Sequence, residues 1–83
     1  MYLVRVYVSL KSTVNDPQGL TILNALHSLG FSSVSDIRAG KYFVMRIDES
    51  DEESARRQVE ESCKKLLANP IIEEYSFDLE RVT

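Results

Sequence analysis

The chain has 83 residues, of which 43% are hydrophobic and 28% charged, and its formal net charge is −3. This length predicts one domain over residues 1–83, without room for a second core, and the composition excludes a disordered chain. The acidic total argues against binding to nucleic acid, which needs a clustered basic surface. Assembly is a common means of stabilising so short a chain, because it buries only about 60% of its unfolded surface.

The first element is a strand over residues 2–11. One face of it is apolar and mostly β-branched, and consists of Val4, Val6, Val8 and Leu10. The other face is only half polar, because Leu3 and Tyr7 stand there beside Arg5 and Ser9. This strand is therefore expected to pack against something on both sides.

A helix follows a break at residues 15–19. Asp16 suits the N-cap position, and Pro17 suits the first helical position, where a missing N–H costs nothing. The apolar stripe of this helix consists of Ile22, Leu23, Leu26 and Leu29. Gly30 is a natural left-handed residue at which the helix ends.

Residues 33–39 are predicted to form a second, weaker strand. Val34 and Ile37 have opposite parity in it, which predicts a bulge if both face the core. A tight turn at Ala39 and Gly40 then leads into a third strand.

The third strand ends near Asp48 and carries large apolar groups on both sides. Phe43, Met45 and Ile47 point to one side, and Tyr42, Val44 and Arg46 to the other. The chain is too short to cover both sides, so we expect a second copy or another protein to cover one of them.

A second helix begins in residues 50–53, which have the spacing of a capping box, and ends at Asn69 and Pro70. Its apolar stripe consists of Ala55, Val59, Cys63, Leu66 and Leu67. The last strand covers residues 71–81, with Tyr75, Phe77 and Leu79 facing inward.

The order βαββαβ predicts an α+β, ferredoxin-like fold: a four-stranded antiparallel sheet with two helices on one face. The first and third strands are central in that topology. Their outer side chains form a predicted self-interface, packed in an oligomer, that consists of Leu3, Tyr7, Tyr42 and Val44.

The sequence offers no set of residues for catalysis or metal binding. His27, the only histidine, has no partner placed by the sequence, and Cys63 falls on an apolar stripe where a small filler is the default. The acids at 48–53 are explained by the start of a helix. Arg38 and Lys41 flank the turn and could meet an anion, but we favour their interpretation as solvated charges. Residues 40–45 match the RNA-recognition strand signature poorly, because Lys41 stands where an aromatic residue belongs.

Several stretches, in order along the whole chain, resemble one family. They are residues 4–11 (VRVYVSLK), 16–19 (DPQG), 27–30 (HSLG), 38–43 (RAGKYF) and 65–73 (KLLANPIIE). Together they resemble PurS, the small subunit of phosphoribosylformylglycinamidine synthase in purine biosynthesis. The sequence departs from the family at Ala39, where a larger aliphatic residue is more frequent.

The resemblance implies part of an enzyme, a glutamine- and ATP-dependent ligase, with no active site and no cofactor on this chain. The complex converts formylglycinamide ribonucleotide, glutamine and ATP to formylglycinamidine ribonucleotide. In the family, a glutaminase subunit, PurQ, releases ammonia, and a large synthetase subunit, PurL, consumes it and is expected to hold ATP and magnesium. PurS-like chains are homo-oligomers, dimers or tetramers, that join the two.

The resemblance and the predicted turns together suggest contacts with the other subunits. The candidates are Asp16, Pro17, Gln18, His27, Arg38, Lys41, Asn69 and Pro70. The chain begins without a basic and apolar leader and has no run that could span a bilayer, and its one cysteine cannot form an internal disulfide. We therefore expect a cytoplasmic protein that binds neither membrane nor nucleic acid.

Two other functions are compatible with the same predicted fold. A small-molecule-sensing regulatory module would bind its ligand at a dimer interface, and calorimetry against amino acids and nucleotides would detect it. A small acylphosphatase-type enzyme needs an arginine in a phosphate-binding loop after the first strand, and residues 12–18 contain none.

Overall fold

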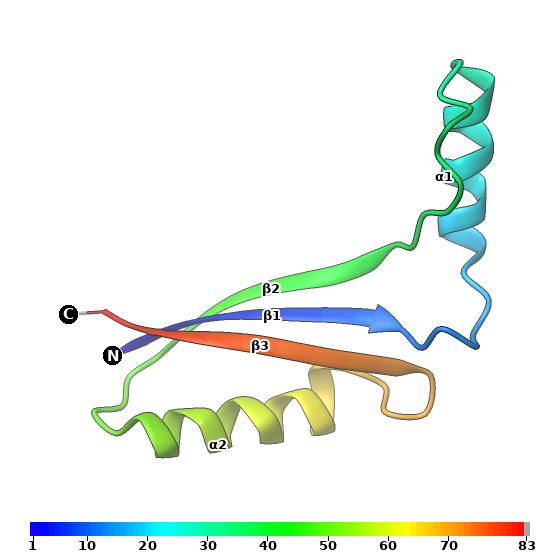
Figure 1. Cartoon of the computed structure of the whole chain (residues 1–83). Coiled ribbons are helices and arrows are strands. Elements are labelled where there is room, and N and C mark those ends of the chain that lie inside the picture. Colours follow the sequence, from blue (N-terminus) through cyan, green and yellow to red (C-terminus); the bar gives the residue numbers. More distant parts are fainter. Residues whose placement is uncertain (83) are drawn as a thin grey trace.

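The computed structural model describes residues 1–82. Three strands, two helices and a short π-helical turn, η1, form along the chain (Figure 1). Their bounds are β1 Tyr2–Leu10, α1 Pro17–Ser28, β2 Gly40–Ile47, α2 Glu52–Ser62, η1 Cys63–Leu67 and β3 Glu73–Arg81. Within these residues, no helix has the length and apolar character needed to cross a membrane.

The strands make one antiparallel sheet in the order β2-β1-β3, so β1 is central and both other strands are edges. In this register Tyr7 lies opposite Tyr42 on β2 and Ser76 on β3. Arg5 lies in the same way between Val44 and Asp78. The central position of β1 explains its β-branched face, which neighbours cover on both sides.

The core lies between one face of this sheet and the helical segment formed by α2 and η1. Val4 and Val6 on β1 are fully buried against Val59 and Cys63 of the helical segment. Large side chains from the edge strands complete the core: Phe43, Met45, Ile47, Tyr75, Phe77 and Leu79. Asp51, one residue after the expected start of the capping box, is the N-cap of α2, and its Oδ2 accepts the Ser54 N–H at 3.1 Å.

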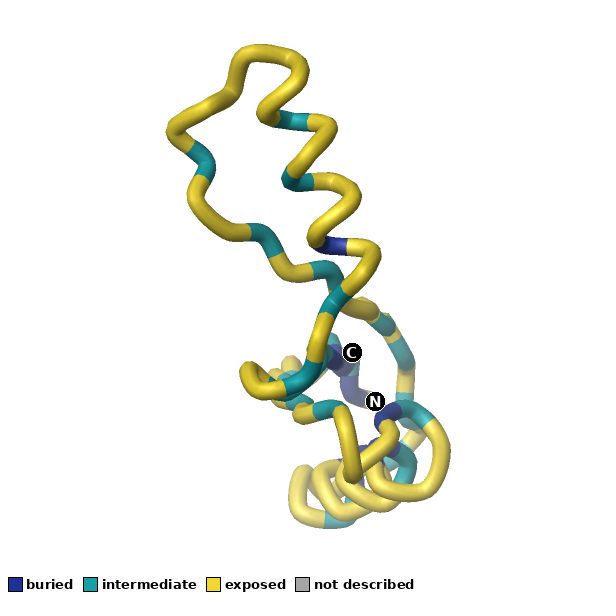
Figure 2. The backbone as a smooth tube through the Cα atoms, turned by 90° about the vertical axis from the view of Figure 1, so that its right-hand side faces the viewer, coloured by how far each residue is buried: buried dark blue, intermediate teal, exposed yellow. Residues whose placement is uncertain are grey.

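Residues 12–39, which we call the arm, project from one end of the sheet (Figure 1). The arm consists of an outgoing leg at 12–16, helix α1, and a return leg at 29–39. Gly19 is its only buried residue, and most of the arm is exposed in Figure 2, with a few half-buried positions. Gly30 has a φ of +97°, as expected for a glycine after a helix. The arm therefore has no core of its own.

The predicted four-stranded ferredoxin-like fold with both helices on one face is wrong. Residues 33–39 form no strand, and α1 extends away from the sheet. The outer strands of a three-stranded sheet lie about 10 Å apart, which is about the width of one helix with its side chains. Because α2 already covers the inner face, there is no place for α1 beside it.

The arm gives the molecule an extended shape. Its principal extents are 50 × 29 × 14 Å, and its radius of gyration is 16.3 Å, against about 12 Å for a compact domain of this length. The solvent-accessible surface is 5997 Å², against about 5,000 Å² for a compact monomer of the same mass. The chain thus exposes more surface than its size requires.

Candidate functional site: the open sheet face and the base of the arm

The outer face of the sheet, opposite α2, carries no layer of this chain. We call it the open face, and its side chains come from all three strands: Leu3, Arg5, Tyr7 and Ser9 of β1, Tyr42, Val44 and Arg46 of β2, and Glu74, Ser76, Asp78 and Glu80 of β3. Tyr42 and Val44 are each 56% exposed and Tyr7 is 44% exposed, whereas Leu3 is half-buried. The Tyr7 and Tyr42 rings lie 5.3 Å apart between centroids, within the range of favourable aromatic pairs. The structure thus places the four predicted self-interface residues on one face.

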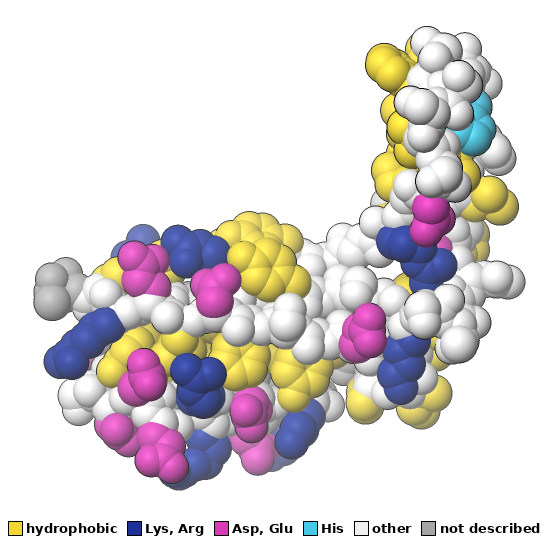
Figure 3. Space-filling view, in the orientation of Figure 1, with side chains coloured by type: hydrophobic (Ala, Val, Ile, Leu, Met, Phe, Trp, Pro, Cys, Tyr) yellow, Lys and Arg dark blue, Asp and Glu magenta, His cyan; other side chains and the backbone are white. Residues whose placement is uncertain are grey.

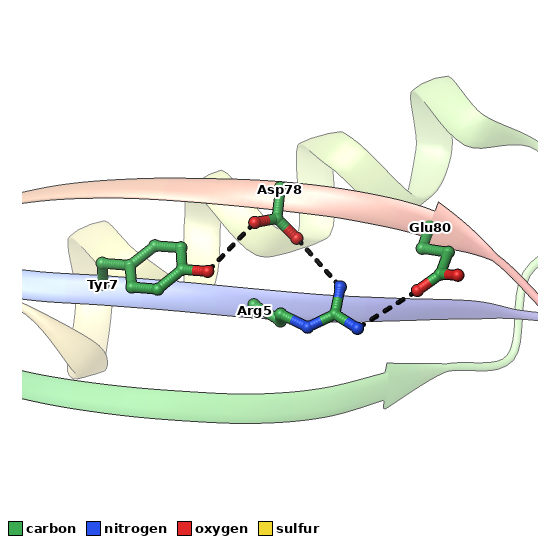
Figure 4. Close-up of polar contacts among 4 residues, drawn as sticks. All are labelled: Arg5, Tyr7, Asp78 and Glu80. Atoms are coloured by element: carbon green, nitrogen blue, oxygen red, sulfur yellow. Dashed lines mark hydrogen bonds and ion pairs between the residues drawn. The ribbon is translucent and has the colours of Figure 1, made fainter.

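A polar network that the sequence analysis missed crosses the β3 side of this face (Figure 4). The Arg5 guanidinium donates to Asp78 Oδ1 at 3.3 Å and to Glu80 Oε2 at 3.2 Å, and the Tyr7 hydroxyl donates to Asp78 Oδ2 at 3.1 Å. Hydrogen bonds to Asp78 and Glu80 raise the pKa of Arg5. Desolvation raises the pKa of Tyr7, and the bond to Asp78 adds to this shift. The open face is therefore apolar at Tyr42 and Val44 of β2 and ion-paired along β3.

Two residues predicted as partner contacts, Asp16 and Arg38, connect the two legs of the arm. Asp16 Oδ1 accepts the Gly19 N–H at 3.0 Å and its Oδ2 accepts the Ala39 N–H at 2.7 Å. These two N–H donors lower the pKa of the Asp16 carboxyl. Arg38 Nη2 donates to the carbonyl oxygens of Lys11 at 3.0 Å and Val14 at 2.8 Å. The interpretation of Arg38 as a solvated turn charge is therefore wrong.

The contact between the legs should weaken in acid. The folded-state pKa of Asp16 is lowered, so its contribution to stability is present above the usual value of 3.8 and is lost as the pH falls through the lower, folded value. In an NMR titration we expect the Gly19 and Ala39 amide shifts to change together, with a midpoint below 3.8. Asp16→Asn should abolish this titration, and a midpoint at or above 3.8 would contradict the assignment.

Lys41 and Asn69 meet at Glu73, where β3 begins. Lys41 Nζ donates to the Leu67 carbonyl oxygen at 3.2 Å and lies 3.3 Å from Glu73 Oε2. Glu73 Oε1 accepts the Asn69 N–H at 2.7 Å, and this bond, followed by that to Lys41, lowers the pKa of Glu73. Lys41 is thus engaged within the chain, contrary to its interpretation as a solvated charge.

The structure brings some of the predicted contact residues together at the base of the arm. Asp16, Gln18 and Lys41 line one hollow of about 260 Å³, together with Glu73. Pro17 begins α1 beside it, and Pro70 is exposed in the turn before β3. In Figure 3 the charged side chains gather over the sheet and α2, whereas few lie on the arm, near its base. This base is the polar end of an otherwise mostly uncharged arm.

His27 lies apart from this group, near the tip of the arm. Its Nε2 is 2.7 Å from the Val34 carbonyl oxygen, so that nitrogen carries a hydrogen and donates. This bond fastens the return leg to α1. Neither His27 nor Cys63, whose thiol pKa is raised by burial, meets a catalytic partner among residues 1–82, and no cluster of metal ligands occurs there.

Replacing His27 with alanine should loosen the tip of the arm. An exposed hydrogen bond contributes modestly to stability, so we expect the Phe31 and Val34 amides to exchange about 3- to 10-fold faster in His27→Ala. Hydrogen-exchange mass spectrometry measures this. Asn24→Ala, on the same helix, is the control, because it raises helix propensity by a similar amount. It should leave the exchange of the Phe31 and Val34 amides unchanged. Equal exchange in wild type and His27→Ala would show that the bond does not hold the return leg.

An extended chain with an uncovered sheet face and an uncovered arm is typical of a subunit that other chains complete. A family model described as PurS, phosphoribosylformylglycinamidine (FGAM) synthase, matches residues 3–81. The PurS subunit from Bacillus subtilis (strain 168) is 49% identical over 82 residues, which cover 99% of this chain and 96% of that protein.

Solved structures of PurS are also similar to this chain. The C2 crystal form of B. subtilis PurS has a TM-score of 0.88 at 48% identity, covering 98% of this chain and all of that one. A chain in the structure of PurLQS from Thermotoga maritima has a TM-score of 0.86 at 30% identity, covering 96% and 99%. The chain belongs to the PurS family and is a subunit of FGAM synthase, a ligase of purine biosynthesis.

Proposed function

We propose that this chain is the non-catalytic joining subunit of FGAM synthase, which binds the PurL synthetase and the PurQ glutaminase and supports the transfer of ammonia between them. The observation that carries this is the match of the whole chain, arm included, to a chain of the T. maritima PurLQS structure. Under this proposal ATP and magnesium bind PurL, no cofactor binds this chain, and the complex works in the cytoplasm.

The transfer of ammonia requires the glutaminase and synthetase sites to be aligned with each other. Ammonia has to pass from the glutaminase to the synthetase without escaping or being protonated, so the two sites need fixed positions relative to each other. A chain with two uncovered surfaces, the open face and the arm, can hold two neighbours at once. We assign the open face to contact with a second copy, and the base of the arm and the turn at Asn69 and Pro70 to contact with the other subunits.

Surface area supports the assignment of a second copy. The chain exposes about 1,000 Å² more than a compact monomer of its mass, and one partner in a standard interface buries about 800 Å². The open face offers the apolar residues Tyr42 and Val44 for this contact. A dimer or tetramer would bury them.

Co-expression of this chain with the PurL and PurQ subunits of the same source tests the proposal. A tag on this chain should retain both other subunits through size-exclusion chromatography, and native mass spectrometry should give a complex that contains all three. Retention of neither subunit, with glutamine and ATP present, would refute the proposed bridging.

A further inference from the structure

The joint between the arm and the sheet is built from residues of both legs, with each leg contributing a side chain that binds the other. Asp16 of the outgoing leg accepts the Ala39 N–H of the return leg. Arg38 of the return leg donates to the carbonyl oxygens of Lys11, which directly precedes the outgoing leg, and of Val14 within it. The two contacts are therefore reciprocal. Either leg alone is irregular backbone, which would bend freely without them.

Close backbone packing restricts the same joint. A Cβ at Gly19 would lie 2.6 Å from the Ile37 carbonyl oxygen and 2.6 Å from Asp16 Oδ2, so the return leg touches the first turn of α1. A Cβ at Gly40 would lie 2.5 Å from the Val8 carbonyl oxygen, where the return leg enters β2. Both glycines permit contacts that any side chain would push apart.

The likeness to known structures limits how far the arm can move. The arm is about a third of the chain, so a large change in its angle to the sheet would lower a TM-score markedly. The scores are 0.88 for the C2 crystal form of B. subtilis PurS and 0.86 for a chain of the T. maritima PurLQS structure. The arm thus keeps about the same angle in both.

We propose that Asp16 and Arg38 form a double clamp that locks the arm at one angle to the sheet and makes it a rigid spacer in the assembled enzyme. The use of the spacer rests on the proposed bridging function, whereas the clamp itself does not. A rigid arm fixes the distance between whatever binds its tip and whatever binds the sheet. A hinged arm of the same composition would hold both partners without aligning them.

Double electron–electron resonance measures the angle directly. Spin labels at Ser32→Cys in the arm and Glu53→Cys on α2 occupy exposed positions, while Cys63 is fully buried and does not compete for label. Dilution with unlabelled protein restricts the signal to pairs within one chain. We expect a single narrow distance peak, and a peak at least about twofold broader when Asp16→Asn and Arg38→Lys are combined.

The matched control combines Asp36→Asn and Arg57→Lys, which make the same chemical changes at exposed positions outside the clamp, and it should keep the narrow peak. Slow reaction of Cys63 with a thiol reagent confirms that the sheet and α2 remain folded in each variant. If the double variant loses this protection, Arg38→Lys alone replaces it, because it keeps the charge and substitutes a shorter side chain for the guanidinium, whose Nη2 makes both carbonyl contacts. A broad distance peak in the wild type, or a peak in the clamp variant as narrow as that of the wild type, would overturn the proposed clamp.

The role as a spacer has a separate readout. In a complex reconstituted with PurL and PurQ, the clamp variant should still co-purify but lose about tenfold in glutamine-dependent turnover while ammonium-dependent turnover is unchanged. Unchanged glutamine-dependent turnover in a variant with a broadened arm would overturn the spacer. Failure of the wild-type chain to co-purify would instead refute the bridging function and leave the distance measurement standing.

Discussion

Val44→Asp is expected to dissociate the self-assembly and raise its dissociation constant by at least about 100-fold. Val44 is 56% exposed on an edge strand of the open face, and burying an unpaired carboxylate in a dry interface costs several kcal/mol. Sedimentation velocity across a range of concentrations measures the change. In register, Val44 lies opposite Arg5, which an aspartate could reach. Val44→Lys cannot pair with Arg5 and should also dissociate the assembly.

Leu66→Asp is the control for this prediction. Leu66 is 82% exposed on η1, away from the open face, so a charge there should leave the oligomer intact. A fully assembled Val44→Asp protein, or dissociation by Leu66→Asp alone, would show that the copies meet elsewhere.

Among the substitutions proposed here, Val6→Ala should lower the thermal stability of the fold the most. Val6 is fully buried at the centre of β1, and its loss removes transfer energy and leaves a cavity, at a cost of about 2 kcal/mol. For a domain of this size that lowers Tm by about 8–16 °C in a thermal melt. Ile71→Ala, at a site 80% exposed, should change Tm by little. Equal shifts for the two variants would contradict the core described here.

The alternation of apolar side chains in strands and the capping residues of helices predicted the local structure well. The valines of β1, the inward side chains of β3 and the Asp16 cap all occur where the sequence places them, because each depends on neighbours in the chain. Residues 33–39 lacked alternation, and they form no strand. The apolar stripe of α1 predicted that it packs against something. It did not identify the partner, since a helix that covers its own sheet and one that covers another chain share the same pattern.

The candidate site also contains some features that the sequence predicted and others that it did not. The apolar residues of the open face followed from strand parity alone, as Tyr42 and Val44 show. The network of Arg5 with Asp78 and Glu80 depends on the register between the first and last strands, which lie more than 70 residues apart. The alternating acids of β3 were its only signal. The bond from Ala39 to Asp16 depends on the fold of the arm and had no signal in the sequence.

The rate of formylglycinamidine ribonucleotide synthesis with two nitrogen sources tests the joining role most directly. PurL and PurQ are assayed with ATP and either glutamine or ammonium, with and without this chain. We expect glutamine-dependent synthesis only when the chain is present, and ammonium-dependent synthesis in both cases. Full glutamine-dependent synthesis without the chain, or any turnover by the chain alone, would contradict this role.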